Sequence, residues 1–133
     1  MVQKKSVSSG RPTEAQAGFC RAIRLDDVSS YICVAGNAAT NPDGSVYAPG
    51  DYYAQTKHIL ETLIKGYLEQ VGASLENVVR TRVYVVDIQK NWEVVARAHG
   101  EVFGDIRPTA TMIGTSALVH PDMVVEIDAD AAM

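Results

Sequence analysis

The sequence is poor in cysteine, and this scarcity already argues against two classes of protein. Cys20 and Cys33 are the only cysteines in 133 residues, and neither belongs to a Cys-x-x-Cys pair or to a compact group of cysteine and histidine. Small disulfide-stabilised domains and structural zinc sites depend on such groups. We therefore expect neither a disulfide framework nor a metal site. Phosphate loops, dinucleotide fingerprints and metalloprotease helices are missing as well.

Positive charge and long apolar runs are also scarce. The chain has 12 Lys and Arg against 16 Asp and Glu, a net charge of −4 at pH 7, so we expect no nucleic-acid partner. No apolar run approaches the roughly 20 residues of a membrane span, and the polar start MVQKKSVSSG has no signal-peptide core. The length suits one domain, residues 1–133. We expect a cytoplasmic protein that does not enter membranes.

Two stretches have the apolar spacing of helices. In the first, Asp51 to Val71, apolar residues recur every three or four positions, Asp51 can act as N-cap and Gly72 can end the helix. The second is Asn91–Phe103, with Asn91 as N-cap. Its predicted inward stripe is Trp92, Val95, His99 and Phe103.

The remaining regular segments have the pattern of strands. Residues 1–16 form an N-terminal arm with few packing signals. We expect the first two strands to pair as an antiparallel hairpin and the last two to lie side by side. The predicted strands are Gly18–Leu25, Ser30–Ala35, Val78–Asp87, Thr109–Ser116 and Met123–Asp130.

This order of elements predicts an α+β fold in which both helices cover one face of a single sheet. The opposite face then carries Arg82 and Tyr84 from one strand and Glu126 from another. Apolar residues are mixed among these polar ones. Self-association is the economical way to cover such a face.

Charged residues on the opposite face are the candidates for chemistry. Glu126 projects from a rigid strand, so it can transfer protons, or it can be a solvated or arginine-paired carboxylate. Arg80 and Arg82 can clamp the carboxylate of a substrate or pair with Asp128 and Asp130. The pattern alone leaves these alternatives open.

Three stretches, in order and with matching spacing, resemble one protein family. They are GNAATNPDGSVYAPGDYYAQTKHILETL, GASLENVVRTRVYVVDI and VVEIDADA, and the resemblance spans about residues 17 to 131. The family is the Rid family, the YjgF/RidA reactive-intermediate deaminases. The resemblance implies a chorismate-mutase-like fold and a homotrimer whose sheets form a central barrel with clefts between subunits. It also implies cofactor-free hydrolysis of enamines and imines, such as 2-aminoacrylate, to keto acid and ammonia.

Several functional positions of the family are replaced in this sequence. The cleft tyrosine matches Phe19, and the serine before the strand-ending glycine matches Ala35. The arginine that anchors the substrate carboxylate matches Ala110, and the cysteine two residues later matches Met112. The resemblance therefore implies a cleft that has lost polar and reactive groups.

Other positions are retained or changed conservatively. The glutamate proposed to position the hydrolytic water is Glu126, and the strand-ending Gly36 is followed by Asn37 in place of glutamine. We expect Glu126 to activate water or shuttle a proton, and the backbone of Gly36 and Asn37 to hold polar atoms. The predicted pocket walls are Phe19, Tyr84, Trp92 and Met112, and of these Phe19 and Met112 should also shield Glu126.

Together these features predict a divergent imine or enamine hydrolase, or a related tautomerase, with a larger and less anionic substrate than usual. A shielded arginine–carboxylate contact contributes about 1.5–3 kcal/mol, and it is lost here unless Arg82 or Arg107 supplies it. The rival interpretation is a non-catalytic ligand-binding or chaperone-like trimer that kept only the fold. A ribonuclease activity, also ascribed to this family, is disfavoured by the acidic composition.

Overall fold

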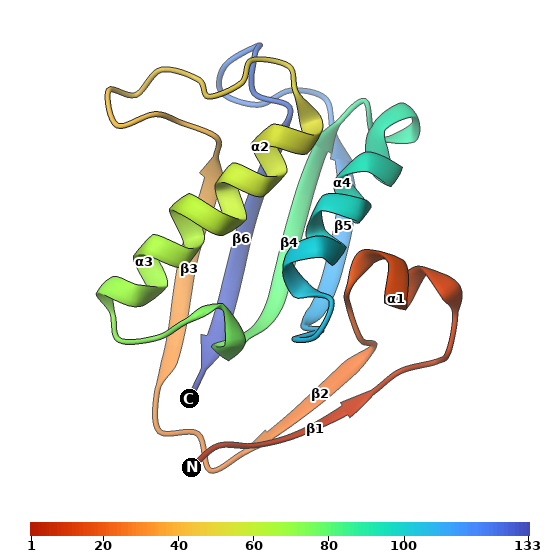
Figure 1. Ribbon diagram of the computed structural model, residues 1–133, viewed down its shortest axis with the longest axis vertical. Coiled ribbons are helices and arrows are strands. Elements are labelled where there is room, and N and C mark those ends of the chain that lie inside the picture. The colour runs from red at the N-terminus through yellow and green to blue at the C-terminus, as the bar shows by residue number, and fades with distance from the viewer.

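A four-stranded mixed sheet forms the centre of the protein (Figure 1). The computed structural model describes residues 1–133. Strand β6 is antiparallel to both of its neighbours, whereas β4 and β5 run parallel, because a helix makes the crossover between them. The strand order is β3 (Tyr31–Ala38), β6 (Val125–Ala132), β4 (Val78–Val86) and β5 (Thr109–Thr115).

Two long helical segments cover one face of this sheet, as predicted (Figure 1). Helix α2 (Tyr52–His58) continues through a π-helical stretch (Ile59–Ile64) into α3 (Lys65–Gln70), and α4 (Ile88–Phe103) lies beside it. None of the helices combines the length and the apolar character that a membrane crossing requires. The largest core side chains between helices and sheet are Ile59, Leu60, Ile64, Leu68, Val83, Val85, Val95, Phe103 and Ile127.

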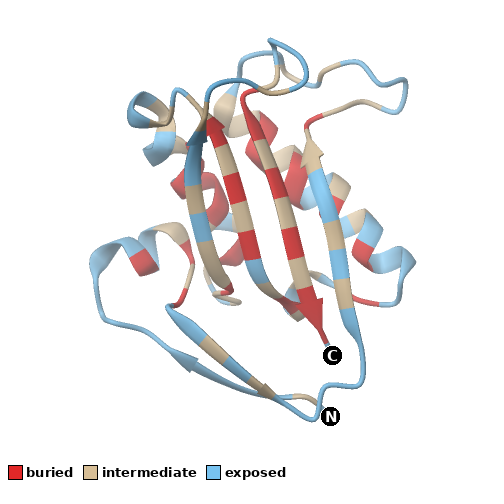
Figure 2. Ribbon diagram, turned by 180° about the vertical axis from the view of Figure 1, so that it is seen from behind, coloured by how far each residue is buried: buried red, intermediate tan, exposed pale blue.

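The other face of the sheet is bare of helices (Figure 2). Buried and half-buried residues alternate along β6, as its sequence predicted. The carboxylates of Glu126, Asp128 and Asp130 belong to the bare face, because the residues between them are buried under the helices. The bare face therefore presents charged groups on a rigid support.

The N-terminal segment is more ordered than predicted. Strands β1 (Gln3–Val7) and β2 (Ala22–Asp26) form a separate antiparallel pair, with α1 (Pro12–Ala17) between them in the chain. The predicted hairpin of Gly18–Leu25 with Ser30–Ala35 is therefore wrong. Because the apolar side of β3 packs under the helices, β3 takes the place beside β6, while β2 leaves the sheet after one bridge from Cys20 to β5.

Helix α1 packs against α4 through glycine. A Cβ at Gly100 would lie 2.2 Å from the backbone oxygen of Gln16, and a Cβ at Gly18 would lie 3.0 Å from Gly100 Cα. Only hydrogen atoms fit in these gaps. The side chain of Glu14 is buried here, where it accepts hydrogen bonds from Ser9 and the backbone of Arg11.

Three further expectations need correction. The last two strands are not neighbours, because β4 lies between β5 and β6. Helix α4 begins at Ile88, directly after Asp87 in a left-handed conformation (φ 53°), and not at Asn91. Trp92 is 37% exposed and lies beside an open hollow at the β5 edge, so it does not belong to the inward stripe.

Candidate functional site

An arginine held by two carboxylates lies on the bare face. Arg82 Nη1 is 2.9 Å from Asp128 Oδ1, and Arg82 Nη2 is 3.5 Å from Asp130 Oδ2. The Tyr84 hydroxyl donates to the second oxygen of Asp128 at 3.1 Å, which raises the pKa of Tyr84. Arg82 therefore pairs with Asp128 and Asp130, which was one of the two roles considered for it, and is not left free to clamp a substrate carboxylate. Its guanidinium is already engaged on both sides.

Glu126 is the third carboxylate of β6 on this face, and Arg82 does not reach it. Glu126 stands opposite Tyr84 in the sheet and is half-buried. A Cβ at Gly36 would lie only 2.6 Å from Glu126 Oε2. The carboxylate therefore rests against bare backbone, in a space that only glycine leaves open.

The backbone around Gly36 is irregular. The pairing of β3 with β6 shifts register between Val34 and Asn37, so Ala35 and Gly36 lie in a bulge. The Asn37 amide donates to the Ala35 carbonyl at 2.8 Å, which fixes the bulge from within. Bulges next to a functional carboxylate commonly serve to aim side chains and backbone groups. Gly36 thus lies against Glu126, while the side chain of Asn37 is engaged within the bulge.

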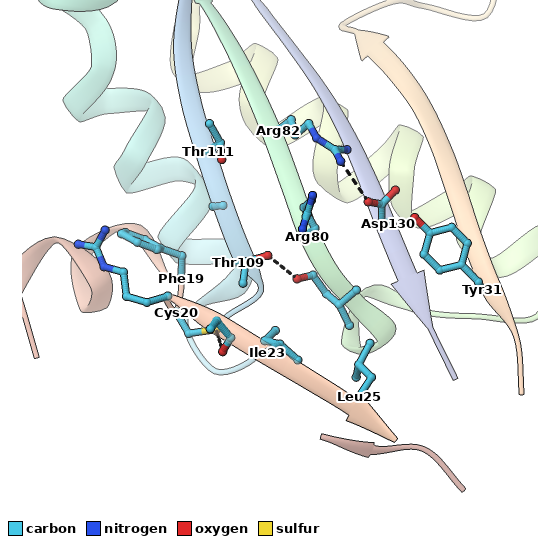
Figure 3. Close-up of a pocket in the computed structure, with 14 residues that line it drawn as sticks. Phe19, Cys20, Ile23, Leu25, Tyr31, Arg80, Arg82, Thr109, Thr111 and Asp130 are labelled. Atoms are coloured by element: carbon cyan, nitrogen blue, oxygen red, sulfur yellow. Dashed lines mark hydrogen bonds and ion pairs between the residues drawn. The ribbon is translucent and has the colours of Figure 1, made fainter. Parts of the chain in front are cut away.

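A cavity of about 690 Å³ opens on the bare face beneath β2 (Figure 3). Ile23 and Leu25 of β2 form its apolar side, and the sheet forms its floor. Because β2 diverges from the sheet after the bridge at Cys20, the space between them stays open. Its remaining lining comes mainly from β4, β5 and the ends of β3 and β6.

The charged residues of this cavity are mostly cationic, although the chain as a whole is acidic. Arg21 is bound by Glu14 at 3.2 Å, and Arg82 is bound as described. Asp130 is the only carboxylate in the lining. Arg80 is exposed and takes part in none of the ion pairs. The cavity therefore contains one uncommitted guanidinium.

A smaller, more enclosed pocket of about 110 Å³ lies at the edge of β5. It shares Phe19, Ala110 and Thr111 with the larger cavity, so the two spaces adjoin. Met112 and the buried His99 complete one of its walls. Thr111 contributes the one hydroxyl, and the other lining groups are apolar or neutral.

His99 is held as a neutral imidazole. Its Nδ1 is 2.6 Å from the Ala17 carbonyl oxygen, and its Nε2 is 2.9 Å from Thr81 Oγ1. A carbonyl only accepts, so Nδ1 donates the proton and Nε2 accepts from the threonine hydroxyl. Burial lowers the pKa of His99, which keeps the ring uncharged. The packing role expected for His99 is confirmed, with an added place in the pocket wall.

Comparison with known proteins now identifies the family. The chain matches the family model described as Endoribonuclease L-PSP over residues 10–133. It belongs to the Rid family. A protein of Streptomyces coelicolor is 33% identical over 127 residues, 96% of this chain and 90% of that protein. A RutC family protein of Pyrococcus abyssi is 34% identical over 104 residues, 78% of this chain and 80% of that protein.

Solved structures agree with this assignment. YyfB of the Rid protein family from Yersinia pestis superposes with a TM-score of 0.85 at 27% identity, and the match covers 98% of each chain. Rv2704 of Mycobacterium tuberculosis, a member of the YjgF/YER057c/UK114 family, is 38% identical with a TM-score of 0.67, covering 98% of this chain and all of the other. The Rid-family membership that the sequence predicted is confirmed.

The positions that match functional sites of Rid proteins fall into separate places in this chain. Phe19, Ala110 and Met112 meet at the small pocket on the β5 edge. Glu126 and Gly36 meet on the bare face, two strands away. Phe19 and Met112 therefore do not shield Glu126 within one Rid chain.

The other predicted wall residues are also dispersed. Tyr84 points to Asp128 on the bare face, whereas Trp92 shares a hollow of about 370 Å³ with Met112 and Ile88. The sequence singled out Arg80 as a possible clamp, but its lack of a carboxylate partner is visible only in three dimensions. No pocket role was predicted for His99, although its position on the inward stripe of the helix was a usable signal.

Proposed function

We propose that this Rid-family protein hydrolyses an imine or enamine, or carries out a related tautomerisation, without a cofactor. The observation that carries this proposal is the state of Glu126. Asp128 and Asp130 are committed to Arg82, while Glu126 enters no ion pair and rests against Gly36 on a rigid strand. A free, positioned carboxylate is what general acid–base catalysis needs.

The chemistry assigned to Glu126 is proton transfer to and from water. The carboxylate accepts a proton as the water oxygen bonds to the imine carbon. The same proton then passes to the nitrogen, which gives a carbinolamine. Glu126 next takes the proton of the new hydroxyl and delivers it to the amino nitrogen as the carbon–nitrogen bond breaks, so ammonia leaves and a carbonyl forms on the substrate. In a tautomerisation, Glu126 moves a proton between carbon and nitrogen of the enamine system.

The proposal places this reaction in a cleft between the subunits of a homotrimer with a chorismate-mutase-like central barrel. Strands β3 and β5 are both free edges of the sheet, which suits head-to-tail closure of a ring. Arg80 stands opposite Asp130, and Tyr84 stands opposite Glu126. Four strand residues span about 13 Å, so a small substrate cannot touch Arg80 and Glu126 of one chain.

Replacement of the family's anchoring arginine favours a substrate that is less anionic than the usual one, unless another cation takes its place. Ala110 offers no charge, and Arg82 is already bound by two carboxylates. The Arg107 Nε donates to the Gly104 carbonyl at 3.3 Å, and Arg107 does not line either cavity. Neither of the two arginines considered from the sequence is placed to serve as the anchor.

The test compares Glu126→Gln with Glu69→Gln, an exposed glutamate of α3. Imines are generated in place by an amino-acid oxidase, and ammonia release is followed. We expect Glu126→Gln to lower the rate by about a hundredfold or more, the usual size of one general acid–base group, and Glu69→Gln to leave it unchanged. Equal rates for wild type and Glu126→Gln would remove the proposal.

The rival function is ligand binding or chaperone-like activity without turnover. The changes at Phe19, Ala35, Ala110 and Met112 favour it, because each removes a polar or reactive group found in the family. Turnover of any imine that depends on Glu126 contradicts this rival. Suppression of aggregation of an unfolded client, unaltered in Glu126→Gln, supports it.

A further inference from the structure

We propose that the Tyr84 hydroxyl is a second hydrogen-bond acceptor for the hydrolytic water beside Glu126. Asp128 and Arg82 fix the hydroxyl in this role. The water donates one hydrogen bond to the Glu126 carboxylate and the other to the Tyr84 oxygen, which leaves a lone pair of the water oxygen free to attack the imine carbon. This inference rests on the proposed function and adds to it a residue that touches the reacting water.

Tyr84 and Glu126 are direct neighbours across two strands. They stand opposite each other in the antiparallel pairing of β4 with β6, so both side chains project from the bare face. The Cβ atoms of such a pair lie about 5 Å apart. The hydrogen bond to Asp128 and desolvation raise the pKa of Tyr84 most, and the nearby charge of Glu126 adds to the rise. The two groups therefore lie within reach of one water molecule.

The single proton of the Tyr84 hydroxyl is committed to Asp128. The hydroxyl donates to Asp128 Oδ2 at 3.1 Å, and an ionised carboxylate can only accept. With its proton engaged, the Tyr84 oxygen faces any other partner as an acceptor, and the Glu126 carboxylate does the same. A group held between them must donate two hydrogen bonds. Water meets this requirement, whereas a carbonyl or carboxylate oxygen does not.

Arg82 determines which oxygen of Asp128 the tyrosine meets. Arg82 Nη1 binds Asp128 Oδ1 at 2.9 Å, so Oδ2 is the oxygen left for Tyr84. The other side of the guanidinium contacts Asp130 at 3.5 Å, as Figure 3 shows. The Asp128 side chain is only 21% exposed, so solvent screens these charge-assisted contacts only in part. The direction of the Tyr84 hydrogen bond is therefore set by the ion pair behind it.

The reaction step balances without any change in the protonation of Tyr84. As the water oxygen bonds to the imine carbon, one water proton moves to Glu126 and the other stays on the new hydroxyl, hydrogen-bonded to the Tyr84 oxygen. The raised pKa of Tyr84 keeps its own proton in place. When Glu126 then takes the hydroxyl proton, the contact with Tyr84 is released. Tyr84 thus aligns the nucleophile, while Glu126 alone transfers protons.

The first experiment removes the Tyr84 oxygen and keeps the ring. Tyr84→Phe should lower kcat for imine hydrolysis about threefold to tenfold, the effect of one neutral hydrogen bond. KM should stay nearly unchanged, because the hydroxyl contacts the water and not the substrate. The matched control is Tyr67→Phe, which removes the same oxygen from an exposed tyrosine of α3. Ammonia release from imines formed by an amino-acid oxidase is measured for both variants and for Glu126→Gln.

The second experiment, Asp128→Asn, reverses the polarity of the Tyr84 hydroxyl. Arg82 needs an oxygen on its side, so the new amide nitrogen faces Tyr84 and donates to its oxygen. The Tyr84 proton then turns to the water and occupies the lone pair that attacks. We expect kcat to fall at least as far as in Tyr84→Phe. Combined with Tyr84→Phe, Asp128→Asn should cause no further fall.

The outcomes separate this inference from the proposed reaction. A lower kcat in Tyr84→Phe at unchanged KM, with no added effect of Asp128→Asn, supports it. Equal kcat in Tyr84→Phe and Tyr67→Phe, with a slow Glu126→Gln, overturns it and leaves the proposed reaction standing. An equal effect of Asp128→Asn with and without the Tyr84 hydroxyl also overturns it, because Asp128 then acts on the fold alone. Absence of turnover, or turnover that does not depend on Glu126, removes both proposals.

Discussion

Gly36→Ala is the sharpest perturbation of the candidate reaction, because it moves the glutamate without changing it. An added Cβ would lie 2.6 Å from Glu126 Oε2, so the oxygen must retreat by roughly 0.8 Å to reach ordinary contact at 3.4 Å. The obstacle is the far end of a flexible side chain, so the cost in stability is small. A displacement near 1 Å at a reacting group costs up to about a hundredfold in rate. We expect kcat for imine hydrolysis to fall tenfold to a hundredfold.

The matched control is Gly66→Ala. Gly66 lies inside α3, and nothing lies within 4 Å of an added Cβ there. The same methyl group should leave the rate unchanged and raise the free energy of unfolding by about 0.5–1 kcal/mol, the usual gain for a helical glycine. Ammonia release and urea unfolding are measured on both variants. Unchanged kcat in Gly36→Ala would show that the carboxylate position does not matter for the reaction.

Three further predictions concern the N-terminal segment and its contact with α4. Gly100→Ala pushes a methyl group into the Gln16 carbonyl 2.2 Å away, and urea unfolding should show a loss of about 1–3 kcal/mol. Hydrogen bonds from Ser9 hold the pKa of Glu14 at about 2, against 4.5 when free. The ionised carboxylate therefore stabilises the folded chain fully above pH 4.5, and this contribution is lost as pH falls toward 2. Glu14→Gln should flatten that part of the plot of unfolding free energy against pH. Burial lowers the pKa of His99 below 6.5, so as pH drops below 6.5 the histidine is protonated in the unfolded chain before it is protonated in the folded one. The free energy of unfolding then falls by up to about 1.4 kcal/mol per pH unit. His99→Gln should remove this slope.

The strands and helices were predictable because apolar residues recur along them with the period of a strand or of a helix. The alternation along β6 and the apolar stripe that follows Asp51 describe local geometry, and both are confirmed. Strand pairing was less accessible, since β2 and β3 are adjacent in the chain but pair with β1 and β6. Periodicity identifies a strand and its buried face, but it does not specify its neighbour.

The candidate site was predictable in residue type more than in arrangement. Glu126 and Gly36 could be selected from the sequence, and the structure places them in contact range. The different fates of Arg80 and Arg82 could not be predicted, because both project from one strand with the same spacing. Arg82 meets Asp128 and Asp130 only through the register of β4 against β6.

Glu126 and the small pocket of Phe19, Ala110 and Met112 lie on different faces of the sheet, and this separation has a genetic consequence if the cleft is shared between chains. A chain with Glu126→Gln and a chain with Ala110→Leu, which fills the pocket, would each be defective, but in opposite walls of the cleft. Co-assembled in equal amounts, they would regenerate intact clefts at about one position in four, each with a glutamate from one parent and an open pocket from the other. Recovery of activity on mixing would mean that the functional unit is the boundary between two chains.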